Sequence, residues 1–210
     1  MIFKICGIKN KKTLICCEKN KVDFFGMIFY EKSPRNISLN NAKTLTSLSE
    51  EFKIKPVGVF VDYNINDLKK IIIYLNLRYI QLHGDEDQAY IDEIKNEFDL
   101  KIIKKISIKT TSDLNKINNF KYIDYLLFDY KPDVNELPGG NSKSFDWNLL
   151  KGQKIQIPWF VSGGINQTNI KKIQNLLNPH GIDLSSGVEE FRGIKSNRKI
   201  NNLFKKINDN

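Results

Sequence analysis

Cysteine is scarce in this chain of 210 residues, which contains three, and two of them, Cys16 and Cys17, are adjacent. Adjacent thiols form neither the regularly spaced framework of a disulfide-stapled protein nor the paired spacing of a zinc site. Cys6 stands alone near the N-terminus. The sequence therefore predicts a reducing, cytoplasmic setting, with no metal and no other cofactor.

Long apolar runs are also missing. No stretch approaches the roughly 18 apolar residues of a membrane span. No basic segment leads into an apolar core, as it does in a signal peptide. We therefore expect no membrane partner. Hydrophobic residues make up 40% of the chain and charged residues 27%, which is typical of an ordered globular protein and fits one domain over residues 1–210.

Acidic residues are outnumbered by basic ones, with 24 Asp and Glu against 33 Lys and Arg, so the net charge is +9. Such a charge suits nucleic acid, an anionic surface or a small anionic substrate. However, the chain has no arginine-rich run and no basic stretch with interleaved aromatic residues. Lysine, isoleucine and asparagine are abundant throughout, so compositional bias accounts for the charge. We expect no nucleic-acid partner.

Short apolar runs alternate with amphipathic segments along the whole chain. The runs predicted as strands are Ile2–Cys6, Phe24–Phe29, Val57–Val61, Tyr79–Leu82, Lys101–Ile106, Tyr125–Phe128, Ile157–Val161 and Gly181–Leu184. Between them apolar residues recur with helical spacing, as at Leu68, Ile71, Ile72 and Leu75. This alternation predicts an α/β fold with a parallel sheet, closed as a single (β/α)₈ TIM barrel. A doubly wound open sheet is the alternative.

The helix patterns differ in strength. Leu45, Leu48 and Phe52 are expected on one helix face, and Asn166 is expected to cap the helix that carries Ile170. Two intervals leave little room for a full helix. They are the asparagine-rich segment Asp113–Phe120 and the segment Ser144–Leu150.

Four polar side chains occupy the positions where a barrel carries its chemistry. Catalytic residues of such barrels lie where strands end or in the loops just after them. Cys6, His83, Asp129 and Asp183 all occupy such positions. A thiol and a carboxylate that each end a strand could act as a base and an acid. His83 is expected to bind the substrate by orienting groups near it, and a structural role is the alternative. Asp183 is expected to hold substrate hydroxyls or to fix the neighbouring loops.

Two glycine-bearing loops follow the last two predicted strands. Glycine lets the backbone approach an anion, N–H groups at a helix start point toward it, and serine hydroxyls add donors. Either loop alone could be only a tight turn. Together, in the loops where barrels often bind phosphate, they predict a phosphate site. Its residues are Gly163, Gly164, Ser185, Ser186 and Gly187.

Two further loops carry candidate ligand-binding residues. Arg35 follows Pro34 after the second strand, and a guanidinium on a proline-stiffened loop suits both oxygens of a carboxylate. A solvated arginine is the alternative. The loop Pro138–Trp147 is long enough to be a mobile cover of the active site. From it Lys143 could reach an anion, although a surface lysine is the commoner outcome.

The chain resembles the phosphoribosylanthranilate isomerase family of tryptophan biosynthesis over nearly its whole length. Each shared motif is short, but their order and spacing are specific. The motifs are Lys4-Ile5-Cys6-Gly7, Ser33-Pro34-Arg35, Gly58-Val59-Phe60-Val61, Gln81-Leu82-His83-Gly84, Leu127-Phe128-Asp129, Gly139-Gly140 leading to Phe145-Asp146-Trp147, Ser162-Gly163-Gly164-Ile165, and Gly181-Ile182-Asp183-Leu184-Ser185-Ser186-Gly187-Val188-Glu189.

Two positions depart from the family's pattern. Asn141-Ser142-Lys143-Ser144 stands where the family usually reads more like Thr-Gly-Lys-Thr, and the loss of a glycine there is expected to stiffen the cover loop. Asp62 stands where a neutral polar residue such as asparagine is expected. Its negative charge would slightly disfavour an anionic ligand.

The resemblance implies a barrel that converts N-(5-phosphoribosyl)anthranilate, a phosphorylated aminosugar, into 1-(2-carboxyphenylamino)-1-deoxyribulose 5-phosphate by an Amadori rearrangement. It implies that Cys6 is the general base, that Asp129 is the general acid and that Arg35 binds the anthranilate carboxylate. A thiolate needs a lowered pKa at Cys6, and a protonated acid needs a raised pKa at Asp129, so we expect the site to shift both. The enzyme would act as a monomer or a homodimer.

Two other functions remain open from the sequence. The aminosugar isomerase of histidine biosynthesis is a related barrel, but it is expected to use two aspartates, and Cys6 argues against it. An inactive basic barrel that acts as a binding protein would explain the charge. The intact acid, base and phosphate-loop residues oppose that hypothesis.

Overall fold

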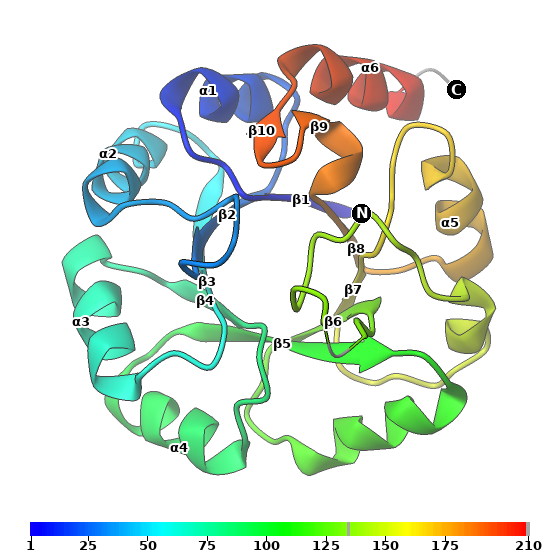
Figure 1. The fold of residues 1–210 in the computed structure, drawn as a ribbon, viewed down its shortest axis with the longest axis horizontal. Coiled ribbons are helices and arrows are strands. Elements are labelled where there is room, and N and C mark those ends of the chain that lie inside the picture. The colour runs from blue at the N-terminus through cyan, green and yellow to red at the C-terminus, as the bar shows by residue number, and fades with distance from the viewer. Residues whose placement is uncertain (134, 209–210) are drawn as a thin grey trace.

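The computed structural model describes residues 1–133 and 135–208 as a closed barrel of eight parallel strands ringed by helices (Figure 1). The strands are β1 (Ile2–Cys6), β2 (Phe24–Phe29), β3 (Lys55–Phe60), β4 (Tyr79–Leu82), β5 (Lys101–Ile108), β6 (Tyr125–Tyr130), β7 (Trp159–Val161) and β8 (Gly181–Leu184). Each strand pairs with the next in chain order, and β8 pairs with β1. This confirms the predicted (β/α)₈ barrel and excludes the open sheet.

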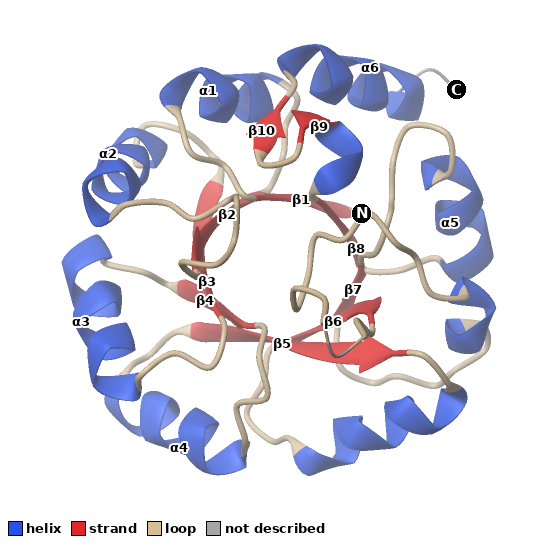
Figure 2. Ribbon diagram, viewed as in Figure 1, coloured by secondary structure: helices blue, strands red, loops and turns tan. Residues whose placement is uncertain are grey.

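Helices cover the outside of the barrel, as Figure 2 shows. The α-helices are α1 (Lys11–Lys19), α2 (Leu39–Ser49), α3 (Ile65–Leu75), α4 (Gln88–Glu97), α5 (Ile170–Leu177) and α6 (Asn197–Asn208). The 3₁₀ helices are η1 (Thr111–Asn119), η2 (Trp147–Leu150) and η3 (Ser186–Val188), and a hairpin of β9 (Glu189–Phe191) and β10 (Ile194–Lys195) precedes α6. The two intervals with little room for a helix therefore hold only 3₁₀ turns.

Polar side chains at the helix starts explain where several helices begin. Asn10, Ser38, Asn64 and Asp87 each accept a hydrogen bond from a backbone N–H in the first turn of the helix that follows. Such a cap replaces the partner that the first N–H groups of a helix lack. Among the described residues, no helix has both the length and the apolar character needed to cross a membrane.

The structure corrects two expectations about helix ends. Helix α5 begins at Ile170, and the side chain of Asn166 accepts instead from the backbone N–H of Thr168 at 2.8 Å, in the turn before the helix. Asparagine favours such local turns as well as caps. Phe52 keeps helical spacing with Leu45 but lies beyond the end of α2. The apolar residues therefore keep helical spacing beyond the point where the helix ends.

The barrel interior is apolar near the strand starts and polar near the strand ends. Phe24, Tyr79 and Tyr125 stand at the first residues of their strands, and Phe160 contacts the rings of Phe24 and Tyr125. A larger apolar cluster fills the space between the strands and the helices. Because successive side chains of a strand alternate between these two sides, every second residue of each strand faces the barrel axis.

Candidate active site

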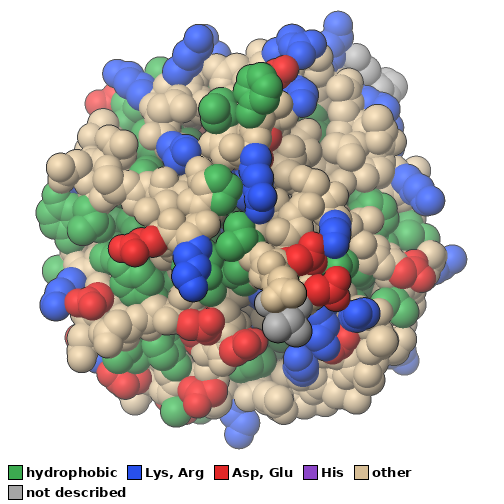
Figure 3. Space-filling model, viewed as in Figure 1, with side chains coloured by type: hydrophobic (Ala, Val, Ile, Leu, Met, Phe, Trp, Pro, Cys, Tyr) green, Lys and Arg blue, Asp and Glu red, His purple; other side chains and the backbone are tan. Residues whose placement is uncertain are grey.

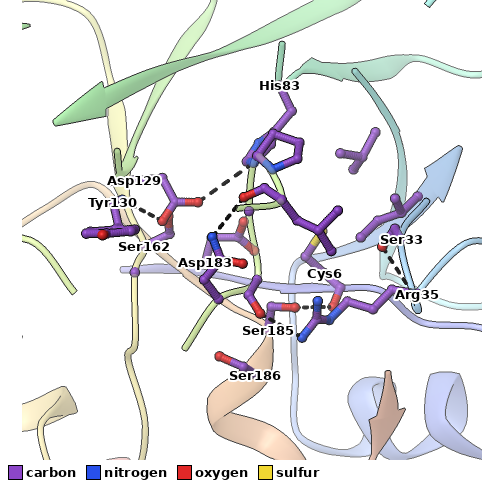
Figure 4. Close-up of a pocket in the computed structure, with 18 of the residues that line it drawn as sticks. Cys6, Ser33, Arg35, His83, Asp129, Tyr130, Ser162, Asp183, Ser185 and Ser186 are labelled. Atoms are coloured by element: carbon purple, nitrogen blue, oxygen red, sulfur yellow. Dashed lines mark hydrogen bonds and ion pairs between the residues drawn. The ribbon is translucent and has the colours of Figure 1, made fainter. Parts of the chain in front are cut away.

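A pocket opens at the carboxyl ends of the strands, where the close-up in Figure 4 shows its side chains gathered around one space. Every residue predicted for the site lines this pocket except Gly187. On the face that carries it, Lys and Arg side chains are dispersed among Asp and Glu, and the described residues form no continuous basic patch there (Figure 3).

The thiol of Cys6 lies at the end of β1 against a glycine of the neighbouring strand. Cys6 is in register with Gly26 of β2, and a Cβ atom on Gly26 would lie 2.8 Å from Sγ. The carbonyl oxygen of Cys6 accepts from Ser185 Oγ at 3.2 Å. Gly26 therefore leaves the room that the thiol occupies, and the loop after β8 holds the backbone of Cys6.

The prediction that the site lowers the pKa of Cys6 is wrong. Burial raises the pKa of this thiol above its ordinary value, since a thiolate loses its hydration there. The charge of Asp183 adds to the rise, whereas those of Lys4, Lys195 and Arg35 oppose it. Three cations are thus placed to favour a thiolate, but burial outweighs them.

Lys4 and Asp183 form an ion pair inside the barrel. They are in register on β1 and β8, and Lys4 Nζ donates to Asp183 Oδ2 at 2.9 Å. Burial alone would lower the pKa of Lys4, but attraction by Asp183 leaves that pKa above its ordinary value, so Lys4 is a cation. Within the described residues, Asp183 Oδ1 is buried without a partner. Most buried carboxylate oxygens do accept a hydrogen bond, so this oxygen is an exception.

Asp129 and His83 face each other across the pocket. His83 Nε2 lies 3.7 Å from Asp129 Oδ2, and the backbone N–H of Tyr130 donates to Asp129 Oδ1 at 2.8 Å. Burial raises the pKa of Asp129, although the nearby Lys105 opposes the rise, so the expected direction is confirmed. A raised pKa favours the protonated form that a general acid needs.

His83 is neutral near pH 7. Burial takes its pKa well below the ordinary histidine value, and the charge of Lys105 lowers it further. Gln81 Nε2 lies 2.8 Å from His83 Nδ1. An amide nitrogen can only donate, so Nδ1 accepts and the neutral ring carries its proton on Nε2, the atom nearer Asp129.

The two glycine loops adjoin each other. Gly163 and Gly164 have φ of +86° and +66°, which favour glycine. A Cβ atom on Gly187 would collide with the carbonyl oxygen of Ile165, so only glycine allows the loop after β8 to lie against the loop after β7. Gly187 therefore shapes the predicted phosphate site from outside the pocket.

Arg35 is neither solvated nor free to grip a ligand with two nitrogens. It is buried, and its Nε and Nη2 donate to the two carboxylate oxygens of Glu189 at 2.7 and 2.8 Å. Nη2 also donates to the carbonyl oxygen of Gly140 at 3.2 Å. The prediction of a two-nitrogen grip on a ligand carboxylate is therefore wrong for this structure, and Nη1 is the nitrogen that remains.

Two charged residues of the motifs that depart from the family have partners within the protein. Lys143 Nζ pairs with Glu136 Oε1 at 2.6 Å and lies over the ring of Tyr130. Asp62 Oδ1 accepts from the backbone N–H of Asp85 at 2.6 Å, and Asp62 does not line the pocket. Ser142, where the family usually has glycine, adopts φ of +59°. The cover loop thus keeps the backbone shape that a glycine would favour.

Several charged residues near the site were missed in the sequence, among them Lys4, Lys105 and Glu189. Lys4 could have been found from its position two residues before Cys6, because alternation puts both on the barrel's inner side. Lys105 lies on β5, and its Nζ donates to the carbonyl oxygen of Pro138 at 3.2 Å, in the cover loop. Glu189 ends a motif of the family, but nothing in its local pattern indicates that Arg35 is its partner.

The chain is similar in sequence to known proteins over nearly its whole length. The family model described as N-(5'phosphoribosyl)anthranilate (PRA) isomerase matches residues 3–206. Proteins named N-(5'-phosphoribosyl)anthranilate isomerase from Thermoanaerobacter sp. (strain X514) and Paramagnetospirillum magneticum are 38% and 34% identical to the chain. The matches cover 97% and 96% of this chain and 96% and 94% of those proteins.

Solved structures show the same likeness. The crystal structure of phosphoribosyl anthranilate isomerase from Thermotoga maritima matches with a TM-score of 0.87 and 29% identity, over 98% of both chains. A structure of the isomerase in complex with reduced 1-(o-carboxyphenylamino)-1-deoxyribulose 5-phosphate matches with a TM-score of 0.84 and 28% identity, also over 98% of both chains.

Proposed function

The chain belongs to the N-(5'-phosphoribosyl)anthranilate isomerase family of tryptophan biosynthesis, and we propose that Cys6 and Asp129 are the general base and general acid of its reaction. The observation that carries this proposal is that β1 and β6, far apart around the barrel, bring a thiol and a carboxylate to one pocket. The whole chain, residues 1–210, would act as one catalytic domain.

Asp129 would start the reaction. Opening the ribose ring of N-(5-phosphoribosyl)anthranilate requires a proton on the ring oxygen, and burial raises the pKa of Asp129 so that its carboxyl group can hold that proton. His83 lies 3.7 Å from the same carboxyl group. As a neutral imidazole it would orient Asp129 rather than compete for the proton.

Cys6 would act after the ring has opened. Ring opening leaves an iminium ion, which makes the neighbouring C2 hydrogen acidic. The same positive charge favours a thiolate beside it, so the iminium ion would assist the cations around Cys6 at the step that needs a base. The thiolate removes the C2 proton and leaves an enolamine, which becomes the amino ketose when C1 gains a proton and the C2 hydroxyl loses one. The sulfur forms no bond to carbon, so no covalent intermediate is expected. Both proton transfers use side chains, and this mechanism needs no cofactor.

The remaining residues would hold the two ends of the substrate. The backbone of Gly163 and Gly164, together with Ser185 and Ser186, would bind the phosphate. Gly187 would keep these loops together, and Asp183 Oδ1 would accept a sugar hydroxyl. Arg35 Nη1 would donate to the anthranilate carboxylate. One chain supplies all these groups, so a monomer or a homodimer could catalyse the reaction.

The test compares wild type, Cys6→Ser and Asp129→Asn in a steady-state assay with N-(5-phosphoribosyl)anthranilate. Each substitution should lower kcat by about 10²–10⁴-fold, the usual contribution of a general base or acid. Cys16→Ser, at a thiol outside the pocket, and Asp133→Asn, at an exposed carboxylate that precedes the cover loop, are the matched controls. If both site variants keep the wild-type rate, the acid–base assignment is wrong.

A further inference from the structure

Glu189 joins two cations beside the pocket. It lies at the start of β9 and is 6% exposed. Its Oε1 accepts from Arg35 Nε and from Lys195 Nζ, both at 2.7 Å. Its Oε2 accepts from Arg35 Nη2 at 2.8 Å and from the backbone N–H of Gly193 at 3.1 Å. Both carboxylate oxygens are thus fully engaged.

These contacts fix the plane of the Arg35 guanidinium. Nε and Nη2 are held by Glu189, and Nη2 also donates to Gly140 in the cover loop. Nη1 makes no hydrogen bond to any described residue. A Cβ atom on Gly140 would collide with Nη1, and both Arg35 and Gly140 line the pocket. The guanidinium therefore has a single nitrogen left for a ligand, in a direction that Glu189 sets.

The cluster of Arg35, Lys195 and Glu189 also carries an uncompensated charge. It contains two cations and one anion, and burial alone would raise the pKa of Glu189, but Arg35 and Lys195 lower it to about 2, so the carboxylate is ionised. Lys195 is 3% exposed and Glu189 is 4% exposed at their side chains. A net charge in such surroundings is unfavourable unless an opposite charge meets it. An anionic group at Nη1 would supply that charge.

We propose that Glu189 is a positioning residue that makes the enzyme selective for an aromatic amine carrying an ortho carboxylate, because it turns Arg35 so that Nη1 meets this carboxylate. The inference rests on the role proposed above for Arg35 and adds the residue that determines its geometry. One correctly directed, charge-assisted hydrogen bond then takes the place of the two-nitrogen grip that the sequence predicted.

Lys195 provides a comparison within the same cluster. Its Nζ donates to the carbonyl oxygen of Ser185 at 3.0 Å and lies 3.2 Å from Ser185 Oγ, so it supports the phosphate loop. Removal of Lys195 should weaken phosphate binding but leave the pair between Arg35 and Glu189 in place. Removal of the Glu189 charge should release Arg35.

The experiment measures kcat/KM with two substrates prepared from ribose 5-phosphate, the glycosylamines of anthranilate and of aniline, which differ only in the carboxylate. Wild type should prefer the anthranilate compound at least tenfold. In Glu189→Gln this preference should fall by about tenfold, mostly through KM of the anthranilate compound. Lys195→Met and Glu190→Gln, the latter at the exposed neighbouring carboxylate, should keep the wild-type preference.

Each other outcome overturns the proposal in a recognisable way. If Glu189→Gln loses kcat/KM equally with both substrates, Glu189 only stabilises the fold. If wild type itself shows no preference, Arg35 does not bind the carboxylate. The roles of Cys6 and Asp129 are tested separately, by Cys6→Ser and Asp129→Asn. Should Glu189→Gln fail to fold, Glu189→Gln/Lys195→Met keeps the net charge of the cluster and should show the same loss of preference.

Discussion

Replacement of Lys4 by methionine should destabilise the barrel strongly, because it leaves Asp183 buried without its partner. The two side chains are 0% and 7% exposed. Removal of one partner of a buried ion pair costs about 3–5 kcal/mol. In a chain of this size each kcal/mol lowers Tm by about 2–4 °C. We therefore expect Tm to fall by about 6–20 °C, measured by calorimetry at pH 7.

The stability lost in Lys4→Met should be larger at high pH than at low pH. Without Lys4, the pKa of Asp183 in the folded state rises further above its unfolded value of about 3.9, since burial already raises it. Between these two pKa values the folded variant binds more protons than the unfolded chain. Its stability is therefore greatest at low pH and falls as pH rises. Relative to wild type, the deficit should shrink from pH 8 to pH 5.

A second substitution separates the buried charge from the lost side-chain packing. Lys4→Met/Asp183→Asn removes both charges and should recover most of the lost stability. Lys12→Met, at an exposed lysine of α1, should leave Tm unchanged. The reasoning fails if Lys4→Met is as stable as wild type, or if the double variant is no more stable than the single one.

Three further predictions concern the pocket. Alkylation of Cys6 by iodoacetamide, followed by mass spectrometry, should increase with pH through a midpoint above the ordinary thiol value of about 8.5, because burial raises its pKa; a midpoint below 8 would contradict this. Gly140→Ala should raise KM about tenfold with a smaller change in kcat, since the new methyl group collides with Arg35 and φ is +72°; an unchanged KM would mean that the two do not meet. Gly187→Ala should weaken competitive inhibition by inorganic phosphate, as its methyl group would push the loop away from Ile165; unchanged inhibition would place the phosphate elsewhere.

The sequence was a good guide wherever a local pattern decides the structure. Apolar runs and helical spacing were enough for the closed barrel, and the ends of strands identified Cys6, His83, Asp129 and Asp183 as neighbours. Helix ends were less certain, since an asparagine such as Asn166 serves a turn as readily as a cap.

Features that depend on distant contacts could not be predicted. Glu189 lies 154 residues after Arg35, and no local sequence pattern indicates that it accepts hydrogen bonds from two nitrogens of the guanidinium. The prediction that the pKa of Cys6 is lowered was wrong for the same reason. The position of Cys6 at the end of a strand showed that the thiol faces the pocket, but it did not show how completely the barrel excludes water from the thiol. Both errors come from packing between segments far apart in the chain.

Because β8 pairs with β1, the barrel cannot close around the active site until the last strand has been synthesised. Lys4, two residues before Cys6, is synthesised 179 residues before its partner Asp183. At the usual pace of translation this gap lasts about 10–35 s. For that time the thiol lacks the strand that shelters it and the loop that binds phosphate. Reactivity of Cys6 toward oxidants should thus be higher in nascent chains than in the closed barrel.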